Sequence, residues 1–144
     1  MRRLLLIATG VIVFLAISFV LARWLSTENR ERDAIYALLV DEARGDARAM
    51  RARLPGCTGR CAATVAANAR RLRTPGAPKI LRLDSKTAYA LGSATGTTRV
   101  AWTVINRRLP VVQCVDVERA GSAIAGRRLV LRSISAPIGG EDSC

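Results

Sequence analysis

The stretch TTRVAWTVINRRLPVVQCVDVERAG, residues 97–121, carries the clearest structural signal in the chain. It holds two runs rich in β-branched residues that are joined near residues 106–108, which is the pattern of a β-hairpin. Alternate positions of a strand point to the same side, so Val100, Trp102 and Val104 share one face. The stretch therefore predicts two antiparallel strands with one face turned to a core.

Further strands are predicted on both sides of this hairpin. The segment KILRLDSKTAYALGS, residues 79–93, suggests two short strands around Asp84 and Ser85. The glycine-containing residues 92–98 are interpreted as a loop between strands, and RRLVLRSISAP, residues 127–137, as one more strand. Together these segments predict an antiparallel meander of four or five strands within residues 79–136, followed by a tail at 137–144.

The residues before the sheet have a helical pattern, and helices are expected within 28–73. Ser26 or Thr27 is a suitable N-cap, and the acids Glu28, Glu31 and Asp33 suit a helix start. Apolar residues then recur at spacings of three and four, with Gly45 as a weak point: Ile35, Leu38, Leu39, Ala43, Ala47, Met50 and Leu54. Arg44, Arg48 and Arg51 face away from this stripe. Residues 61–73 suggest a second helix, and TPGAPK, residues 74–79, a break. Helices followed by a meander indicate an α+β domain whose sheet packs on the long helix.

An apolar run occupies residues 4–22, LLLIATGVIVFLAISFVLA, without a charged side chain. As a helix it is about 28 Å long, close to the hydrocarbon thickness of a bilayer. Arg2 and Arg3 favour an N-terminus on the cytoplasmic side. We expect a transmembrane signal anchor over residues 1–25 and an exported domain, periplasmic or extracellular, over 26–144. Cleavage as a signal peptide after Ala22 is the alternative.

The chain has four cysteines, all in the part expected to be exported: Cys57, Cys61, Cys114 and Cys144. An even number outside the cytoplasm favours disulfides. Pro55 and Gly56 end a helix just before Cys57, so a Cys57–Cys61 bridge is predicted at the corner between two helices, with Cys114–Cys144 as the second. Crossed pairings, a four-thiolate zinc site and a redox-active Cys57–Cys61 pair are the alternatives.

The chain contains no histidine, which excludes Ser–His and Cys–His nucleophile pairs and histidine-ligated metals. No catalytic, cofactor-binding or metal-binding residue is predicted, and we expect a protein that is not an enzyme. The formal net charge is +12. This charge either reflects the amino-acid composition alone or serves to bind a partner. Such a partner would be another envelope protein or an anionic surface polymer. The few aromatic residues argue against specific nucleic-acid recognition.

The order of elements over residues 31–136, opening with AIYALLVDEARGDARAM at 34–50, resembles the cystatin-like or NTF2-like superfamily. That resemblance implies a curved antiparallel sheet around a helix. It carries over no catalytic residue, because the Asp–His pair of such enzymes needs a histidine. The resulting expectation is a membrane-anchored extracytoplasmic binding or scaffolding domain that contacts the bilayer through residues 4–22.

Two further function classes stay open. A pilin-like or pseudopilin-like assembly subunit has a similar element order. Its processing motif is absent, because Gly10 is followed by Val11 and the position expected to hold glutamate is Leu15. An enzyme or thiol-redox protein is the third interpretation.

Overall fold

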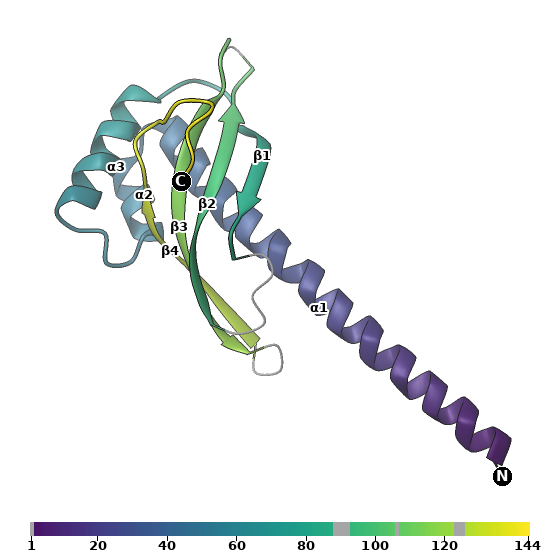
Figure 1. Cartoon of the computed structure of the whole chain (residues 1–144). Coiled ribbons are helices and arrows are strands. Elements are labelled where there is room, and N and C mark those ends of the chain that lie inside the picture. The colour runs from purple at the N-terminus through teal and green to yellow at the C-terminus, as the bar shows by residue number, and fades with distance from the viewer. Residues whose placement is uncertain (1, 88–92, 106, 123–125) are drawn as a thin grey trace.

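The computed structural model describes the backbone of residues 2–87, 93–105, 107–122 and 126–144. Within these ranges the side chains of residues 2, 4–6, 23–28, 122, 126 and 127 are outside the description. The fold is α+β, as predicted, with helices packed against a four-stranded antiparallel sheet (Figure 1). The elements are α1 (Arg2–Arg44), α2 (Ala47–Arg53), α3 (Arg60–Arg71), β1 (Lys79–Ser85), β2 (Ala94–Thr103), β3 (Val111–Ser122) and β4 (Gly126–Ile134).

Helix α1 is continuous from Arg2 to Arg44, so the predicted helix start at Ser26 or Thr27 is wrong. The helix ends at Arg44, and it is followed by Gly45, whose φ of 78° is a conformation that favours glycine. The N–H of Gly45 donates to the carbonyl of Glu42 (2.9 Å), and the N–H of Asp46 donates to that of Asp41 (2.9 Å). This pair of bonds is a Schellman motif, and it satisfies carbonyls that the helix end would leave unpaired.

The apolar stripe that predicts one helix is therefore divided between two. Asp46 caps α2, because its Oδ1 accepts from the N–H groups of Arg48 (3.1 Å) and Ala49 (2.9 Å). Met50 on α2 and Leu54 after it are buried in the same cluster as the α1 residues Leu38 and Leu39. Gly45 therefore separates two helices and does not only weaken one. It lets the chain turn, and the apolar side chains of both helices remain in the same core.

The sheet is a meander in the order β1-β2-β3-β4. The predicted hairpin is confirmed, with Trp102 opposite Val111 at its closed end and Ala94 opposite Arg119 at its open end. The predicted loop at 92–98 is wrong from Ala94 onward, because β2 begins there. The two strands predicted in 79–93 are represented by β1 alone, and residues 88–92 lie outside the described residues.

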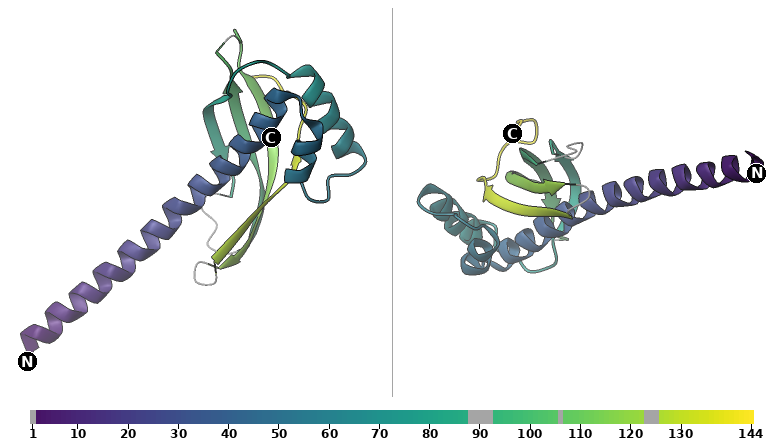
Figure 2. Two further views of the ribbon diagram at one scale, coloured as in Figure 1. Left: turned by 180° about the vertical axis from the view of Figure 1, so that it is seen from behind. Right: turned by 90° about the horizontal axis from the view of Figure 1, so that it is seen from below.

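The second half of α1 crosses one face of the sheet, and the C-terminal tail lies over the other face (Figure 2). Ile35, Leu38 and Leu39 of α1 belong to one buried cluster with the hairpin residues Val100 and Trp102. On the opposite face, the side chain of Arg99 donates to tail carbonyls of Gly140 and Asp142. The alternation predicted for the hairpin is thus realised, with apolar side chains on the helix side.

Both predicted disulfides are present. Cys57 and Cys61 are joined across the α2–α3 corner with a Cα–Cα distance of 5.2 Å. Cys114 on β3 is joined to Cys144 in the tail, with a Cα–Cα distance of 5.7 Å. The described chain has no free cysteine, so its thiols are engaged in these bridges rather than in a metal site.

The first half of α1 projects away from the domain as a single helix (Figure 1). Its described large apolar side chains are more than half exposed, and examples are Ile7 (64%), Phe14 (68%) and Phe19 (59%). Within the described residues, no helix is sufficiently long and apolar to cross a membrane. The span predicted at 4–22 is therefore not confirmed, and the side chains of its residues 4–6 lie outside the description.

Candidate functional site

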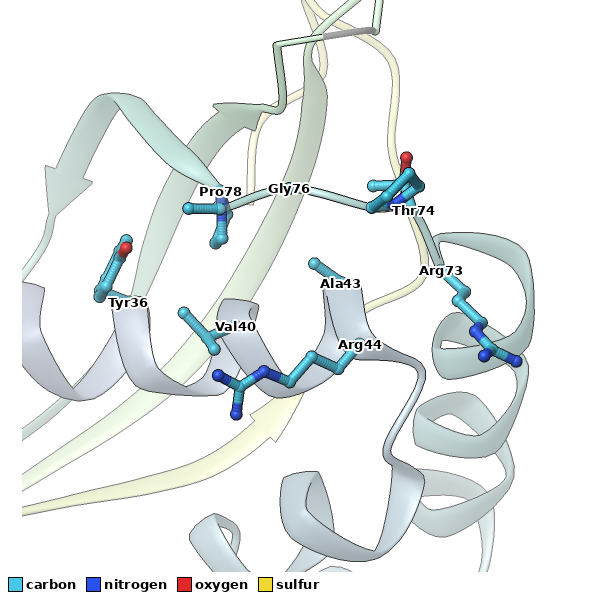
Figure 3. A pocket seen from close by; sticks show the side chains of 10 residues that line it. Tyr36, Val40, Ala43, Arg44, Arg73, Thr74, Gly76 and Pro78 are labelled. Carbon is cyan, nitrogen blue, oxygen red and sulfur yellow. The ribbon is translucent and has the colours of Figure 1, made fainter.

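A groove lies between the last turns of α1 and the loop that connects α3 to β1 (Figure 3). Its volume is about 960 Å³ and it opens to solvent. The lining has one wall from the helix and one from the loop: Tyr36, Val40, Ala43, Arg44, Arg73, Thr74, Pro75, Gly76, Ala77 and Pro78. None of the described residues that line it is acidic.

Helical spacing and loop chemistry explain how this groove forms. Tyr36, Val40 and Ala43 are three or four positions apart, so they lie on one face of α1. The loop is held beside this face because the N–H of Thr74 donates to the carbonyl of Ala43 over 2.9 Å. Gly76 adopts a φ of 111°, which lets the loop turn between its two prolines. The backbone hydrogen bond between Thr74 and Ala43 thus fixes the two walls of the groove relative to each other.

The groove adjoins a strongly basic part of the domain. Residues 47–73 contain no acid, and the preceding acids are engaged, because Asp41 pairs with Arg53, Glu42 is buried and Asp46 caps α2. Apart from Arg53, the exposed arginines here have no ion pair among the described residues, and we call them the basic helical end: Arg44, Arg48, Arg51, Arg60, Arg70, Arg71 and Arg73. In the sheet, by contrast, Arg82, Arg99, Arg119 and Arg132 each face a carboxylate.

A buried ion pair fixes α1 on the sheet. Arg119 of β3 donates from Nη2 to Oε2 of Glu31, and both side chains are almost fully buried. The hydroxyl of Thr98 donates to Oε1 of Glu31 over 2.5 Å, and Arg119 Nη1 donates to the carbonyl of Thr87 over 2.9 Å. The prediction that Glu31 marks a helix start is therefore wrong, since it lies inside α1 as the partner of a buried arginine.

A second buried polar cluster joins α1, the hairpin and α3. The indole N–H of Trp102 donates to Oε1 of Gln113 (2.7 Å), whose Nε2 donates to Oε1 of Glu42 (2.8 Å). Asn68 of α3 donates from Nδ2 to the carbonyl of Ser135 (2.8 Å), which also accepts from Gln113 (3.2 Å). The cluster thus connects α1, α3 and the sheet through neutral side chains and one carboxyl group.

Burial raises the pKa of Glu42 from 4.5 to about 7. The amides of Gln113 and Asn68 and the guanidinium of Arg107 oppose this rise. Oε2 of Glu42 and Nη1 of Arg107 are buried without a hydrogen-bond partner among the described residues. Among the described residues, Glu42 has no ion pair that would offset the cost of burying a charged carboxylate. The protonated form of Glu42 is therefore favoured up to a pH well above the usual pKa of a glutamic acid.

The sequence singled out the four cysteines as site residues, and the structure places them in two bridges on separate parts of the fold. Sequence reasoning missed the groove and the roles of Glu31 and Glu42. A signal for Glu42 was present, because this acid lies four positions after Leu38 and three after Leu39, which is the spacing of the apolar stripe. No comparable signal marks the groove, whose two walls come from residues about thirty positions apart.

Comparisons with protein families, with curated proteins and with solved structures found no match to this chain. The resemblance to the cystatin-like or NTF2-like superfamily therefore stays a prediction that rests on the order of elements.

Proposed function

We propose that this protein is a membrane-anchored extracytoplasmic domain that binds an anionic surface polymer through the basic helical end. The observation that carries the proposal is the gathering of exposed arginines on and around α2 and α3 without an acidic partner among the described residues. Guanidinium groups bind phosphate and carboxylate through two parallel hydrogen bonds. An unneutralised set of them suits a polymer that repeats such groups.

The anchor is part of the same proposal. The described part of the apolar run, residues 7–22, has no charge and exposes its large side chains all around the helix, including Val11, Ile12 and Val13 at consecutive positions. A helix that is apolar on every side is typical of a fully buried or lipid-embedded segment, and the described large apolar side chains here are each more than half exposed. Residues 4–22 would then lie in the bilayer.

The position of the basic helical end favours a polymer over the headgroups of the same membrane. Helices α2 and α3 lie at the far end of α1 from the N-terminus (Figure 1). From residue 22 to Arg44 the helix rises by about 33 Å, roughly four Debye lengths at physiological salt. Lipid headgroups at the anchor are therefore too distant to neutralise these arginines.

The same surface is poorly suited to a folded protein partner. Protein interfaces depend on a few buried aromatic or apolar anchors. None of the exposed large hydrophobic side chains that the structure describes lies on α2 or α3. A charged surface without large exposed apolar side chains is expected to bind flexible polyanions, and this binding should depend strongly on salt concentration.

The test is binding of polyphosphate and of poly-glutamate to the full chain in nanodiscs of zwitterionic lipid, at increasing salt. The variant Arg48→Gln/Arg51→Gln/Arg70→Gln should weaken binding more than tenfold at low salt. The control Lys79→Gln/Arg108→Gln/Arg128→Gln removes the same charge from exposed sheet and turn positions and should weaken it much less. Equal losses in both variants, or no binding at low salt, would contradict the proposal.

A pilin-like or pseudopilin-like subunit is the second candidate, and the continuous helix α1 favours it. Its first half projects and its second half packs on the sheet, so copies could assemble through their projecting halves (Figure 2). Chemical crosslinking in membranes tests this candidate. A ladder of many crosslinked subunits favours assembly, and a single monomer band opposes it.

A further inference from the structure

Two polar atoms of opposite charge type are buried near the Trp102–Gln113–Glu42 cluster without a hydrogen-bond partner among the described residues. They are Oε2 of Glu42 on α1 and Nη1 of Arg107 in the turn between β2 and β3. Buried donors and acceptors are nearly always paired in folded proteins, because an unpaired group has lost its water and gained no bond. An unpaired acceptor and an unpaired donor in one region therefore require an explanation.

The contacts in the structure hold the guanidinium of Arg107 only weakly. Its Cζ lies 6.0 Å from the centre of the Trp102 ring, which is the outer limit of a cation–π contact. Arg107 has no ion pair among the described residues. The backbone of this residue is fixed better, because its N–H donates to the carbonyl of Val104 over 2.9 Å. The side chain is thus a donor that another partner could engage.

Glu42 is the partner that the arrangement offers. Its side chain is fully buried, and its Oε1 accepts from Nε2 of Gln113 on β3 over 2.8 Å. Asn68 of α3 also faces the carboxyl group. Among the described residues, Arg107 is the charged group that acts on Glu42 electrostatically. Asp41, which precedes Glu42 on α1, is paired with an arginine of α2 instead.

The protonation state of Glu42 decides whether the two unpaired atoms need each other. The neutral carboxyl group tolerates burial with its bond from Gln113, and its surroundings favour this form. Once the proton is released to solvent, Oε2 carries negative charge in the core and requires a donor. Nη1 of Arg107 is such a donor, and a guanidinium–carboxylate bond is stronger than a cation–π contact at 6.0 Å.

We propose that Arg107 is the counter-ion of ionised Glu42, and that this pair is a pH-sensitive switch of the β2–β3 turn. When Glu42 is protonated, the guanidinium remains beside Trp102, as in the structure. When Glu42 is ionised, the guanidinium leaves the ring and Nη1 donates to Oε2. The switch concerns a different part of the fold from the basic helical end, and it would hold whether or not the polymer proposal is correct.

The turn that the switch moves presents apolar side chains to solvent. Ile105 is 95% exposed and Leu109 is 77% exposed, and they precede and follow Arg107 by two positions. The turn lies at the end of the sheet that points away from the N-terminus (Figure 1). Because the guanidinium is attached to this turn, its movement toward Glu42 changes how the two apolar side chains are presented.

The experiment uses the isotope-labelled full chain in nanodiscs of zwitterionic lipid and follows its NMR spectra from pH 4 to 9. We expect the side-chain Nε–H of Arg107 and the backbone amides of Arg108 and Leu109 to shift with the same midpoint as the carboxyl carbon of Glu42. These shifts should be absent in Glu42→Gln, whose side chain stays neutral. Turn resonances that stay constant while Glu42 titrates, or that still shift in Glu42→Gln, would overturn the proposal.

Variants of Arg107 distinguish a counter-ion from a residue that only supports the turn. Arg107→Gln removes a positive charge that favours ionised Glu42, so the midpoint of Glu42 should rise by about one pH unit or more, and the turn should no longer respond. Arg107→Lys keeps the charge and should restore part of both effects. The matched control Arg108→Gln removes the adjacent exposed arginine and should leave the midpoint unchanged. A midpoint that Arg107→Gln does not raise, or equal rises in both glutamine variants, would refute the pairing.

Discussion

Gln113 and Glu42 meet in the centre of the domain, where the amide of Gln113 donates to the carboxyl group of Glu42 over 2.8 Å. Neither side chain is exposed. The contact joins β3 to α1, and Gln113 also accepts from the indole of Trp102. A titratable group thus lies at the junction of helix and sheet, so the protonation of Glu42 is coupled to the stability of the fold.

The first prediction is that stability decreases as the pH rises from about 4.5 to about 7. The folded state raises the pKa of Glu42 from 4.5 to about 7, so between these values the folded chain holds the proton that the unfolded chain releases. Stability therefore decreases with pH in this window and levels off above it, by about 3 kcal/mol in total. Thermal unfolding of the full chain from pH 4 to 8 measures this.

Glu42→Gln keeps a neutral side chain at every pH and should remove the decrease, so the variant should be more stable than the parent at pH 8. The control Glu141→Gln changes an exposed acid and should keep the parent's pH profile. A decrease of the same size in Glu42→Gln would show that other groups cause it.

The second prediction concerns the buried pair Glu31–Arg119. Glu31→Gln leaves the charge of Arg119 without its partner in the core and should destabilise by about 3–5 kcal/mol. Glu31→Leu/Arg119→Met removes both charges and should recover much of the loss. For comparison, Arg132→Met breaks the partly exposed pair with Glu118 and should cost less than about 1 kcal/mol. Denaturant unfolding compares the four proteins, and similar losses in Glu31→Gln and Arg132→Met would contradict the assigned role.

The third prediction tests the turn between α1 and α2. Gly45→Ala forces a side chain into the left-handed region, and its Cβ would lie 2.9 Å from Cδ of Arg73 and 3.0 Å from the carbonyl oxygen of Ala69. We expect a loss of about 2 kcal/mol or more. Gly56→Ala is the matched control. The φ of Gly56 is similar, 84°, but no described atom would lie within 4 Å of the added Cβ. It should lose only about 1 kcal/mol, and equal melting temperatures of the two variants would refute the close approach.

The fourth prediction ranks the disulfides. Cys114→Ser/Cys144→Ser opens a bridge that spans 30 positions, and Cys57→Ser/Cys61→Ser opens one that spans four. On the chain-entropy model the losses are about 3.7 and 2 kcal/mol. Unfolding under oxidising conditions measures both, and non-reducing peptide mapping of the parent should find no crossed pair. The reverse ranking would indicate that contacts, not loop closure, set the contribution of these bridges.

The fifth prediction concerns the anchor. Alkaline phosphatase fused after Cys144 should be active outside the cytoplasm, and the fusion should stay in membranes through a carbonate wash. This follows from the uncharged run at residues 4–22 and the arginines that precede it. Recovery of a soluble, shortened protein that begins at Arg23 would instead establish cleavage.

Local patterns in the sequence were sufficient for the strands that form the hairpin and for the choice of their buried face. Alternation acts between neighbouring residues, so Val100 and Trp102 could be assigned to the core without knowledge of the fold. The helix break at Pro55 and the position of the tail favoured the disulfide pairs, and the structure decided against the crossed pairings. The loop expected at 92–98 was wrong from Ala94 onward, because Gly96 is typical of a turn, whereas pairing with Val117 of β3 holds it in β2.

The sequence by itself determined the α+β order and the faces of the hairpin, because these depend on spacing along the chain, and it favoured the cysteine pairs that the structure then showed. Only the tertiary structure decided which partners Glu31 and Glu42 meet, that α1 ends at Arg44 before Gly45, and that α1 and the α3–β1 loop enclose a groove. Burial of an acid depends on partners such as Arg119 and Gln113, which lie about 70–90 positions away. Side-chain spacing cannot encode such a meeting, since it occurs only when the sheet packs on the helix.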